Sequence, residues 1–209
     1  MSTLENLSTH LISGKVEETK KYTQQALDEG LTPKEVLNNG LLVGMAEVGR
    51  RFKNNEFYVP EVLIAARAMK GAMAILKPLL TQTGVEPFAK VSLGTVKGDL
   101  HDIGKNLVGM MLEGGGFEVI DLGVDVTADK FIASVKEKGA QIIGLSALLT
   151  TTMINMKDIL KALEAENLRR KVKVIIGGAP VTDAYAHEIG ADGYAADAAS
   201  AVELVKSLL

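Results

Sequence analysis

The sequence contains no cysteine and few histidines or aromatic residues. Without cysteine the chain can form no disulfide, no thiolate metal site and no cysteine nucleophile. Only His10, His101 and His187 are present among 209 residues, so a metal site built from several histidines is not expected. One histidine cannot hold a free metal ion, and a metal bound at one of them would have to arrive with its other ligands attached.

Long basic runs and long apolar runs are also missing. The formal net charge of -3 makes nucleic acid a poor partner on electrostatic grounds. No apolar stretch reaches the roughly 18 residues that suggest a membrane span. The N-terminal residues Met1–Asn6 lack the basic segment and apolar run of a signal peptide. We therefore expect a cytoplasmic protein that binds neither nucleic acid nor a membrane.

The first 80 residues have the pattern of a helical bundle. Apolar residues recur at helical spacing, as at Leu7 and Leu11. Thr32-Pro33 is a helix start signal, and Pro60 can occupy the first turn of the next helix. No strand-like alternation interrupts the region. These features predict four short helices over residues 1–83, packed as a four-helix bundle.

A polar segment that ends in proline, Thr81–Pro87, separates this region from one with a different pattern. From residue 88, strand-like runs alternate with helical periods, which predicts a parallel sheet covered by helices on both faces. Five strands favour a flavodoxin-like, doubly wound sheet in the order 2-1-3-4-5. The predicted strands are Lys90–Val96, Glu118–Asp121, Gln141–Ser146, Lys173–Ile176 and Gly193–Ala195, and the predicted helices cover 103–114, 128–138, 153–167, 181–189 and 198–208. The fold class is therefore α/β, with a helical cap domain at 1–83 and a Rossmann-like domain at 88–209.

This strand order also indicates where a ligand would bind. In such sheets ligands bind beyond the carboxyl ends of the strands, where the winding direction reverses. That place lies between the first and third predicted strands, which are followed by the loops Lys97–Asp102 and Ala147–Thr152. The residues of these two loops are therefore the first candidates for a site.

The first loop carries His101, whose imidazole could ligate a transition metal through one ring nitrogen. The other nitrogen would then donate to a carboxylate, and Asp99 lies two residues earlier. Gly104 leaves room for a ligand at the start of the next helix. The simpler interpretation is a solvated loop histidine, with Asp102 acting only as a helix cap.

The other two pieces follow the third and fourth strands. Ser146, Thr150 and Thr152 place three hydroxyl groups near the switch point, although Thr152 could simply cap the following helix. Gly177 and Gly178 permit close approach by a bulky ligand, or merely a tight turn. Each piece by itself is weak evidence for a site.

Taken together, the order and spacing of these residues match a known family. Asp99-x-His101-x-x-Gly104, Ser146-x-Leu148 and Gly177-Gly178 resemble the DxHxxG…SxL…GG signature of cobalamin-binding domains. The helical half carries Gly44-Met45-x-x-Val48-Gly49-x-x-Phe52 and Phe57-x-Val59-Pro60-x-Val62. That pattern resembles the helical cap of methionine synthase and of small methanogen and acetogen corrinoid proteins. The resemblance covers nearly the whole chain.

The resemblance implies a cobalamin or related corrinoid, such as methylcobalamin, bound base-off and His-on. His101 would be the axial ligand to cobalt, Asp99 would hydrogen-bond its other ring nitrogen, and Thr152 would extend that chain. Ser146 and Thr150 would bind the buried nucleotide tail. The remaining cofactor-binding positions implied by the matched motifs are Gly98, Asp102, Ile103, Gly104, Leu148, Gly177, Gly178 and Ala198, with Phe52, Val59 and Val62 from the cap over the methyl-bearing face. Where this chain has Asn38, methionine synthase has an acidic residue that contacts the cofactor. The resemblance therefore does not extend to a cofactor contact by Asn38.

The resemblance also implies a function, that of a methyl carrier without catalytic residues of its own. A substrate:corrinoid methyltransferase would load the methyl group, and a methylcorrinoid:tetrahydrofolate or coenzyme M methyltransferase would remove it. A reductive activase would be a third partner. The methyl donor stays open among methanol, methylamines, methoxylated aromatics and betaines. Alternatives are a corrinoid-sensing or cobalamin-storage protein, the small subunit of a cobalamin-dependent mutase, and a cofactor-free flavodoxin-like interaction module.

Overall fold

The computed structural model describes residues 1–209, which form two compact units. The first unit is helical and spans Met1–Pro87, and the short stretch Gly114–Gly116 is grouped with it. The second is an α/β unit that begins at Phe88 and ends at Leu209. The sequence-based bounds of 1–83 and 88–209 stay a prediction about independent domains. No helix combines the length and apolar character needed to span a membrane.

The helical unit contains four helical segments, the third of which is continuous through a π-helical turn. The elements are α1 (Thr3–Ile12), α2 (Val16–Asp28), α3 (Pro33–Val36), η1 (Leu37–Leu41), α4 (Leu42–Lys53) and α5 (Val59–Gln82). The third segment starts with a capping box, in which the Thr32 hydroxyl accepts from the Glu35 N–H at 3.2 Å and the Glu35 carboxylate accepts from the Thr32 N–H at 2.8 Å. Pro60 lies in the first turn of α5, as predicted.

The helices of this unit are not all short, which corrects one prediction. The segment from Pro33 to Lys53 is unbroken, and α5 has 24 residues. Since α5 continues to Gln82, the first two residues of the predicted linker Thr81–Pro87 are helical. The polar composition of Thr81 and Gln82 marked the exposed end of a helix rather than a loop.

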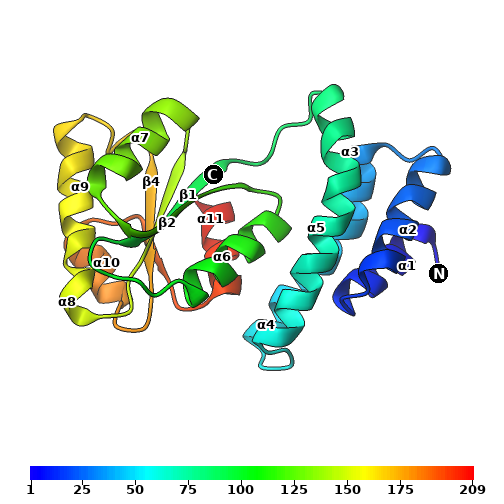
Figure 1. Ribbon diagram of the computed structural model, residues 1–209, viewed down its shortest axis with the longest axis horizontal. Coiled ribbons are helices and arrows are strands. Elements are labelled where there is room, and N and C mark those ends of the chain that lie inside the picture. Colours follow the sequence, from blue (N-terminus) through cyan, green and yellow to red (C-terminus); the bar gives the residue numbers. More distant parts are fainter. The chain divides into compact units, whose positions relative to one another are not determined.

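The α/β unit contains a parallel five-stranded sheet in the predicted order β2-β1-β3-β4-β5 (Figure 1). Its strands are β1 (Lys90–Val96), β2 (Glu118–Val126), β3 (Ile142–Ser146), β4 (Lys173–Gly177) and β5 (Gly193–Ala195). Its helices are α6 (Ile103–Gly114), α7 (Ala128–Lys138), α8 (Thr150–Met153), α9 (Asn155–Ala165), α10 (Asp183–Ile189) and α11 (Ala198–Ser207). The α/β fold class is confirmed.

Each face of the sheet packs against its own set of helices (Figure 1). One core contains Phe131, Ile159 and Ile189, from α7, α9 and α10. The other contains Leu112 and Val205, from α6 and α11. The helices therefore cover both faces and leave the carboxyl ends of the strands open for the loops that follow them.

The largest departure from the predicted sheet is β2, which extends to Val126 rather than ending at Asp121. Its pairing with β1 shifts register twice, and the register continues at Gly94↔Gly123 and Val96↔Val126. Two residues in this stretch, Gly123 and Asp125, have positive φ angles. Because the backbone is irregular here, the residues after Asp121 do not alternate in the period-two pattern by which strands are predicted from sequence.

Candidate functional site

The candidate site lies where three neighbouring strands end in register. Thr95 of β1 pairs with Ser146 of β3, which pairs in turn with Gly177 of β4. Since β2 lies on one side of β1 while β3 to β5 continue on the other, β1 and β3 flank the switch point of the sheet. The sheet therefore brings the two predicted loops, 97–102 and 147–152, to one edge.

Asp99 is the centre of this edge. Its side chain is completely buried and accepts four hydrogen bonds. Oδ1 accepts from His101 Nδ1 at 2.7 Å and from the His101 N–H at 3.1 Å. Oδ2 accepts from Thr152 Oγ1 at 2.7 Å and from the Leu148 N–H at 2.8 Å. One carboxylate thus joins the loop after β1 to the loop after β3.

These bonds favour the ionised form of Asp99 and fix the tautomer that a neutral His101 ring adopts. Burial by itself raises the pKa of Asp99, but the hydrogen bonds from Thr152, the Leu148 N–H and His101 outweigh it and hold the pKa well below its usual range. An ionised carboxylate can only accept, so the neutral imidazole of His101 carries its proton on Nδ1. Nε2 then keeps the lone pair that a metal needs.

The ring that Asp99 holds is open to a ligand. The side chain of His101 is 50% exposed, while Asp99 beside it is 0% exposed. Two exposed apolar residues, Leu100 and Ile103, flank the histidine in sequence, and two more, Leu148 and Leu149, lie in the loop after β3. No cluster of three or more His, Asp or Glu side chains is placed to hold a metal ion. This surface fits a flat, largely apolar group that brings a metal with its other ligands in place.

The start of α6 gives an independent observation in favour of a bulky ligand. Asp102, Ile103 and Gly104 are all exposed there. A Cβ atom added to Gly104 would meet no atom within 4 Å. The protein itself therefore has no packing reason for glycine at this helical position, and the open space fits a cofactor. The Asp102 side chain accepts from Asn106 Nδ2 at 3.0 Å.

The glycine pair after β4 has a different explanation. Gly178 has a φ of +121°, and a Cβ atom there would overlap the carbonyl oxygen of Ala147. A Cβ atom on Gly177 would stand 3.0 Å from the carbonyl oxygen of Ala195. Close packing of the loops against each other is therefore sufficient reason for Gly178. Of the two interpretations of this residue, the tight turn is the one that the geometry requires.

The other predicted residues are found in different settings. Ser146 is half-buried at the end of β3, Thr150 is exposed in α8, and Gly98 has a φ of +81° beside Thr152. Ala198 is buried at the start of α11. A cofactor contact by Ala198 stays a prediction.

The predicted cap residues lie in the helical unit. Phe52 is half-buried in α4, Val59 is exposed at the start of α5, and Val62 is fully buried in that helix. Val62 thus belongs to the core of its own unit. A role of these three side chains toward a cofactor stays a prediction.

Sequence analysis missed three side chains that hold the first loop. Thr95 Oγ1 donates to the His101 carbonyl at 2.9 Å, and Asn155 Nδ2 donates to the Lys97 carbonyl at 2.8 Å. Asp125 Oδ1 accepts from the Gly98 N–H at 2.7 Å. These bonds to the main chain have no sequence motif. The only available signal was the run of polar residues near strand ends.

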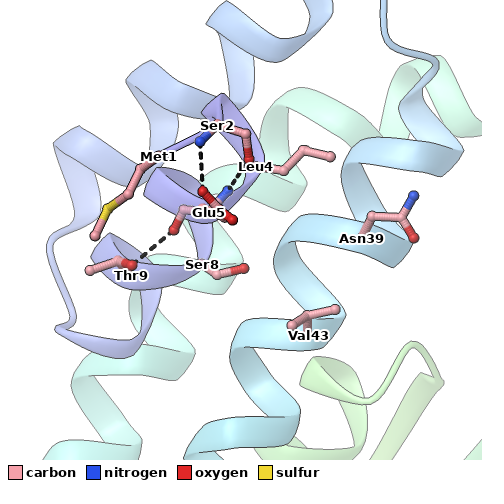
Figure 2. A pocket seen from close by; sticks show the side chains of 8 residues that line it. All are labelled: Met1, Ser2, Leu4, Glu5, Ser8, Thr9, Asn39 and Val43. Carbon is pink, nitrogen blue, oxygen red and sulfur yellow. Dashed lines mark hydrogen bonds between the residues drawn. The ribbon is translucent and has the colours of Figure 1, made fainter.

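A separate hollow occurs in the helical unit, between α1 and the η1–α4 segment (Figure 2). Polar groups that line it serve the local helix ends, as where the Ser2 N–H donates to Glu5 and the Thr9 hydroxyl donates to the Glu5 carbonyl (Figure 2). Ser8 Oγ donates to the Gly40 carbonyl at 2.6 Å. None of the predicted site residues lines this hollow.

Comparisons with known proteins are consistent across the whole chain. The B12 binding domain family matches residues 89–203, and a second family, also described as a B12 binding domain, matches residues 3–77. A corrinoid protein from Desulfitobacterium hafniense is 44% identical over 212 residues, which cover 100% of this chain and 98% of the relative. The dimethylamine corrinoid protein of Methanosarcina barkeri is 44% identical over 207 residues, covering 99% and 97%. A chain of the methanol:cobalamin methyltransferase complex from Methanosarcina barkeri has a TM-score of 0.87 at 26% identity, covering 99% of this chain and 79% of that one.

Proposed function

The chain belongs to the B12 binding domain family and binds cobalamin or a related corrinoid, and from that premise we propose that it carries a methyl group on cobalt between two separate methyltransferases. The observation that carries the proposal is the hydrogen-bonded series Thr152–Asp99–His101, which ends in a half-exposed imidazole at the edge of the sheet. A corrinoid bound there would supply the cobalt centre that takes up and releases the methyl group.

The residues of this chain would bind and tune the cofactor. His101 Nε2 would be the lower axial ligand, with the cofactor base-off and its own base displaced. Asp99 would keep the proton on Nδ1 and raise the basicity of the ring, while Thr152 and the Leu148 N–H hold Asp99 in place. The open position at Gly104 would admit the cofactor near α6.

The nucleotide tail would enter beside the ends of β3 and β4. Ser146 and Thr150 offer hydroxyl groups on this side of the site, and Gly177 is the register neighbour of Ser146. Gly98, Asp102, Ile103 and Leu148 would border the ring. The proposed binding residues thus come from the segments that follow β1, β3 and β4.

The methyltransferases would be separate proteins. A relative of this chain is a dimethylamine corrinoid protein, and a structural neighbour is part of a methanol:cobalamin methyltransferase complex. The second enzyme would pass the methyl group to tetrahydrofolate or coenzyme M, and a reductive activase would restore the cofactor after accidental oxidation.

The helical unit would act as a cap. We infer that Phe52 and Val59 face the methyl-bearing side of the cofactor at rest, with Val62 packed behind them in the core of the unit. Residues 83–87, which follow α5, would let the unit swing away for a partner. Such closure is a common way to exclude water and then admit a second protein.

The decisive experiment compares His101→Ala with His187→Ala, a control at an exposed histidine outside the site. Purified full-length chains are loaded with cobalamin and examined by absorption spectroscopy. His101→Ala should retain some corrinoid but lose the histidine-coordinated spectrum, and His187→Ala should match the unaltered chain. An unchanged spectrum in His101→Ala would remove the assignment of the axial ligand.

Methyl carriage is tested with the same material. Chains loaded with methylcobalamin are mixed with methylcorrinoid:tetrahydrofolate or coenzyme M methyltransferases, and the methylated product is measured. Transfer from the bound cofactor supports the proposal. Tight binding of the corrinoid without transfer to either acceptor would instead favour a sensing or storage protein.

A further inference from the structure

Asp125 has an unusual backbone conformation near the end of β2. Its φ angle is 51°, in the left-handed region that few residues other than glycine adopt. Its side chain is exposed, so packing in a hydrophobic core does not explain the conformation. The residue lies outside all three cobalamin-binding motifs. A strained and exposed aspartate beside a site calls for another reason.

The contacts of Asp125 provide that reason. Its Oδ1 atom accepts from the Gly98 N–H at 2.7 Å, and its own N–H donates to the Asp99 carbonyl at 3.0 Å. One residue therefore holds the main chain on both sides of the Gly98–Asp99 peptide. We call this pair of bonds the Asp125 clamp. The left-handed conformation lets the side chain and the N–H of one residue reach the same loop.

The clamp complements the bonds that hold the Asp99 side chain. Thr152 and the Leu148 N–H fix the carboxylate from the β3 side, whereas Asp125 fixes the main chain of Asp99 from the β2 side. The carboxylate in turn accepts from His101 Nδ1. The position of the imidazole therefore depends on contacts from both neighbours of β1, which act on Asp99 and on the adjoining Gly98.

We propose that Asp125 is a positioning residue that holds Asp99, and through it the His101 ring, in place for the cobalt of a bound corrinoid. The inference rests on the function proposed above. Asp125 itself would not touch cobalt. Without the clamp the loop 98–101 would keep its bonds to Thr95 and Thr152 but would sample more positions, and fewer of these would suit axial ligation.

Three substitutions at Asp125 distinguish the effect of the side-chain hydrogen bond from the effect of the left-handed backbone conformation. Asp125→Asn keeps an oxygen acceptor and tolerates the left-handed region, as aspartate does. Asp125→Gly keeps the conformation and removes the acceptor. Asp125→Ala removes the acceptor and disfavours the conformation. Asn167→Ala is the matched control, because Asn167 also has a positive φ, 56°, but lies between α9 and β4.

The full-length variants are loaded with cobalamin, reduced to the Co(II) state and examined by electron paramagnetic resonance, in which the axial nitrogen splits the cobalt signal. Asp125→Gly and Asp125→Ala should lower the equilibrium constant for histidine ligation about tenfold or more, as expected for loss of a hydrogen bond to a charged group. Asp125→Asn should restore most of it, and Asn167→Ala should leave it unchanged. In the cofactor-free chain, the NMR signal of the Gly98 amide should move in Asp125→Gly, which reports on the clamp directly.

The outcomes distinguish this inference from the proposed function. A normal histidine-coordinated signal in the unaltered chain that survives undiminished in Asp125→Gly would overturn the inference alone. An unaltered chain without a histidine-coordinated signal would overturn the proposed role of His101 as axial ligand, and this inference with it. If Asp125→Ala fails to fold, Asp125→Gly and Asp125→Asn still decide the question.

Discussion

The carbonyl oxygen of Ala147 occupies the space where a side chain on Gly178 would begin, and a Cβ atom there would also stand 2.9 Å from the Ala147 carbonyl carbon. Gly178 is therefore glycine because two loops touch, whereas Gly104 faces open space. The two motif glycines differ in their physical origin. Substitutions at them should differ accordingly.

Gly178→Ala should destabilise the cofactor-free protein by about 2 kcal/mol or more, from backbone strain and overlap with Ala147. Gly104→Ala should leave its stability unchanged or raise it by up to about 1 kcal/mol, because alanine favours the helix and meets no neighbour. Gly104→Ala should nevertheless weaken cobalamin binding. Urea unfolding and cobalamin titration measure the two effects. Equal stability of the two variants would contradict the packing argument.

Thr152→Val should destabilise the cofactor-free protein by about 1.5–3 kcal/mol, because it removes the hydroxyl that donates to the buried carboxylate of Asp99. The change preserves the shape of the side chain, so the loss reports on the hydrogen bond. Thr152→Ser keeps the hydroxyl and is the control. Urea unfolding at neutral pH compares the two, and the hydroxyl is unimportant if both variants lose the same stability.

The stability of the cofactor-free chain should depend on Asp99 in acid. The pKa of Asp99 is lowered in the folded state, so its contribution is complete above the unfolded value of about 3.9 and is lost as the pH falls through the folded value. The free energy of unfolding should therefore fall below about pH 4. The Asp99→Asn variant should be less stable than the unaltered chain at neutral pH, and its free energy of unfolding should depend less on pH below about pH 4. Urea unfolding between neutral and acid pH tests this, and parallel profiles would rule out Asp99 as the source.

A buried lysine gives a fourth prediction. Lys105 is 2% exposed and donates to Asp121 at 2.5 Å and to Asn106 at 2.7 Å. Burial raises the pKa of Asp121, but the bonds from Lys105 and the Gly123 N–H lower it more, so the carboxylate is ionised. Asp121→Ala leaves the buried ammonium without its counter-ion and should lower the free energy of unfolding by about 1–3 kcal/mol. The expected loss is smaller than for a fully buried ion pair, because Asp121 is half-exposed and solvent screens its charge.

Lys105→Met removes the buried charge itself and should cost less than Asp121→Ala. The double variant Lys105→Met with Asp121→Ala should recover part of the loss caused by Asp121→Ala alone. A double-mutant cycle from urea unfolding gives the coupling between the two residues. Additive effects would mean that the pair does not interact in solution.

The proposed role of Phe52 in the cap can be tested by photolysis of bound methylcobalamin. Phe52→Ala should speed net photolysis of bound methylcobalamin, because an aromatic ring over the cobalt face would hold the radical pair together. Corrinoid affinity should change little, since most of the proposed binding residues lie in the α/β unit. Phe88→Ala is the control, because Phe88 is an exposed aromatic residue that packs edge-on against Phe117 outside the predicted cap. Equal photolysis rates in the two variants would argue against Phe52 as a shield.

The meeting of the two candidate loops could be predicted from the sequence, because strand order decides which loops lie together. Once β1 and β3 are neighbours at the switch point, Asp99 and Thr152 have to lie close together, although 52 residues separate them in the sequence. The same reasoning could not find Asp125, since β2 was predicted to end at Asp121. Its contribution depends on one φ angle and two main-chain bonds, and neither leaves a periodic pattern.

The reason for Gly178 was also beyond the sequence. A glycine required by a ligand and a glycine required by a neighbouring carbonyl look identical in a motif. Similarly, the polar residues Thr81 and Gln82 suggested a linker, although they end α5. Polar composition correctly indicated that these residues are exposed, but both a helix end and a loop can be exposed.

The complete burial of Asp99 beside a half-exposed His101 has a consequence for divergence within such proteins. The side chains that orient the imidazole, Asp99 and Thr152, lie beneath the surface. Exposed residues beside the imidazole, such as Leu100 and Leu149, can therefore vary without altering the hydrogen bond that orients the His101 ring. Recognition and reactivity can evolve separately on this fold.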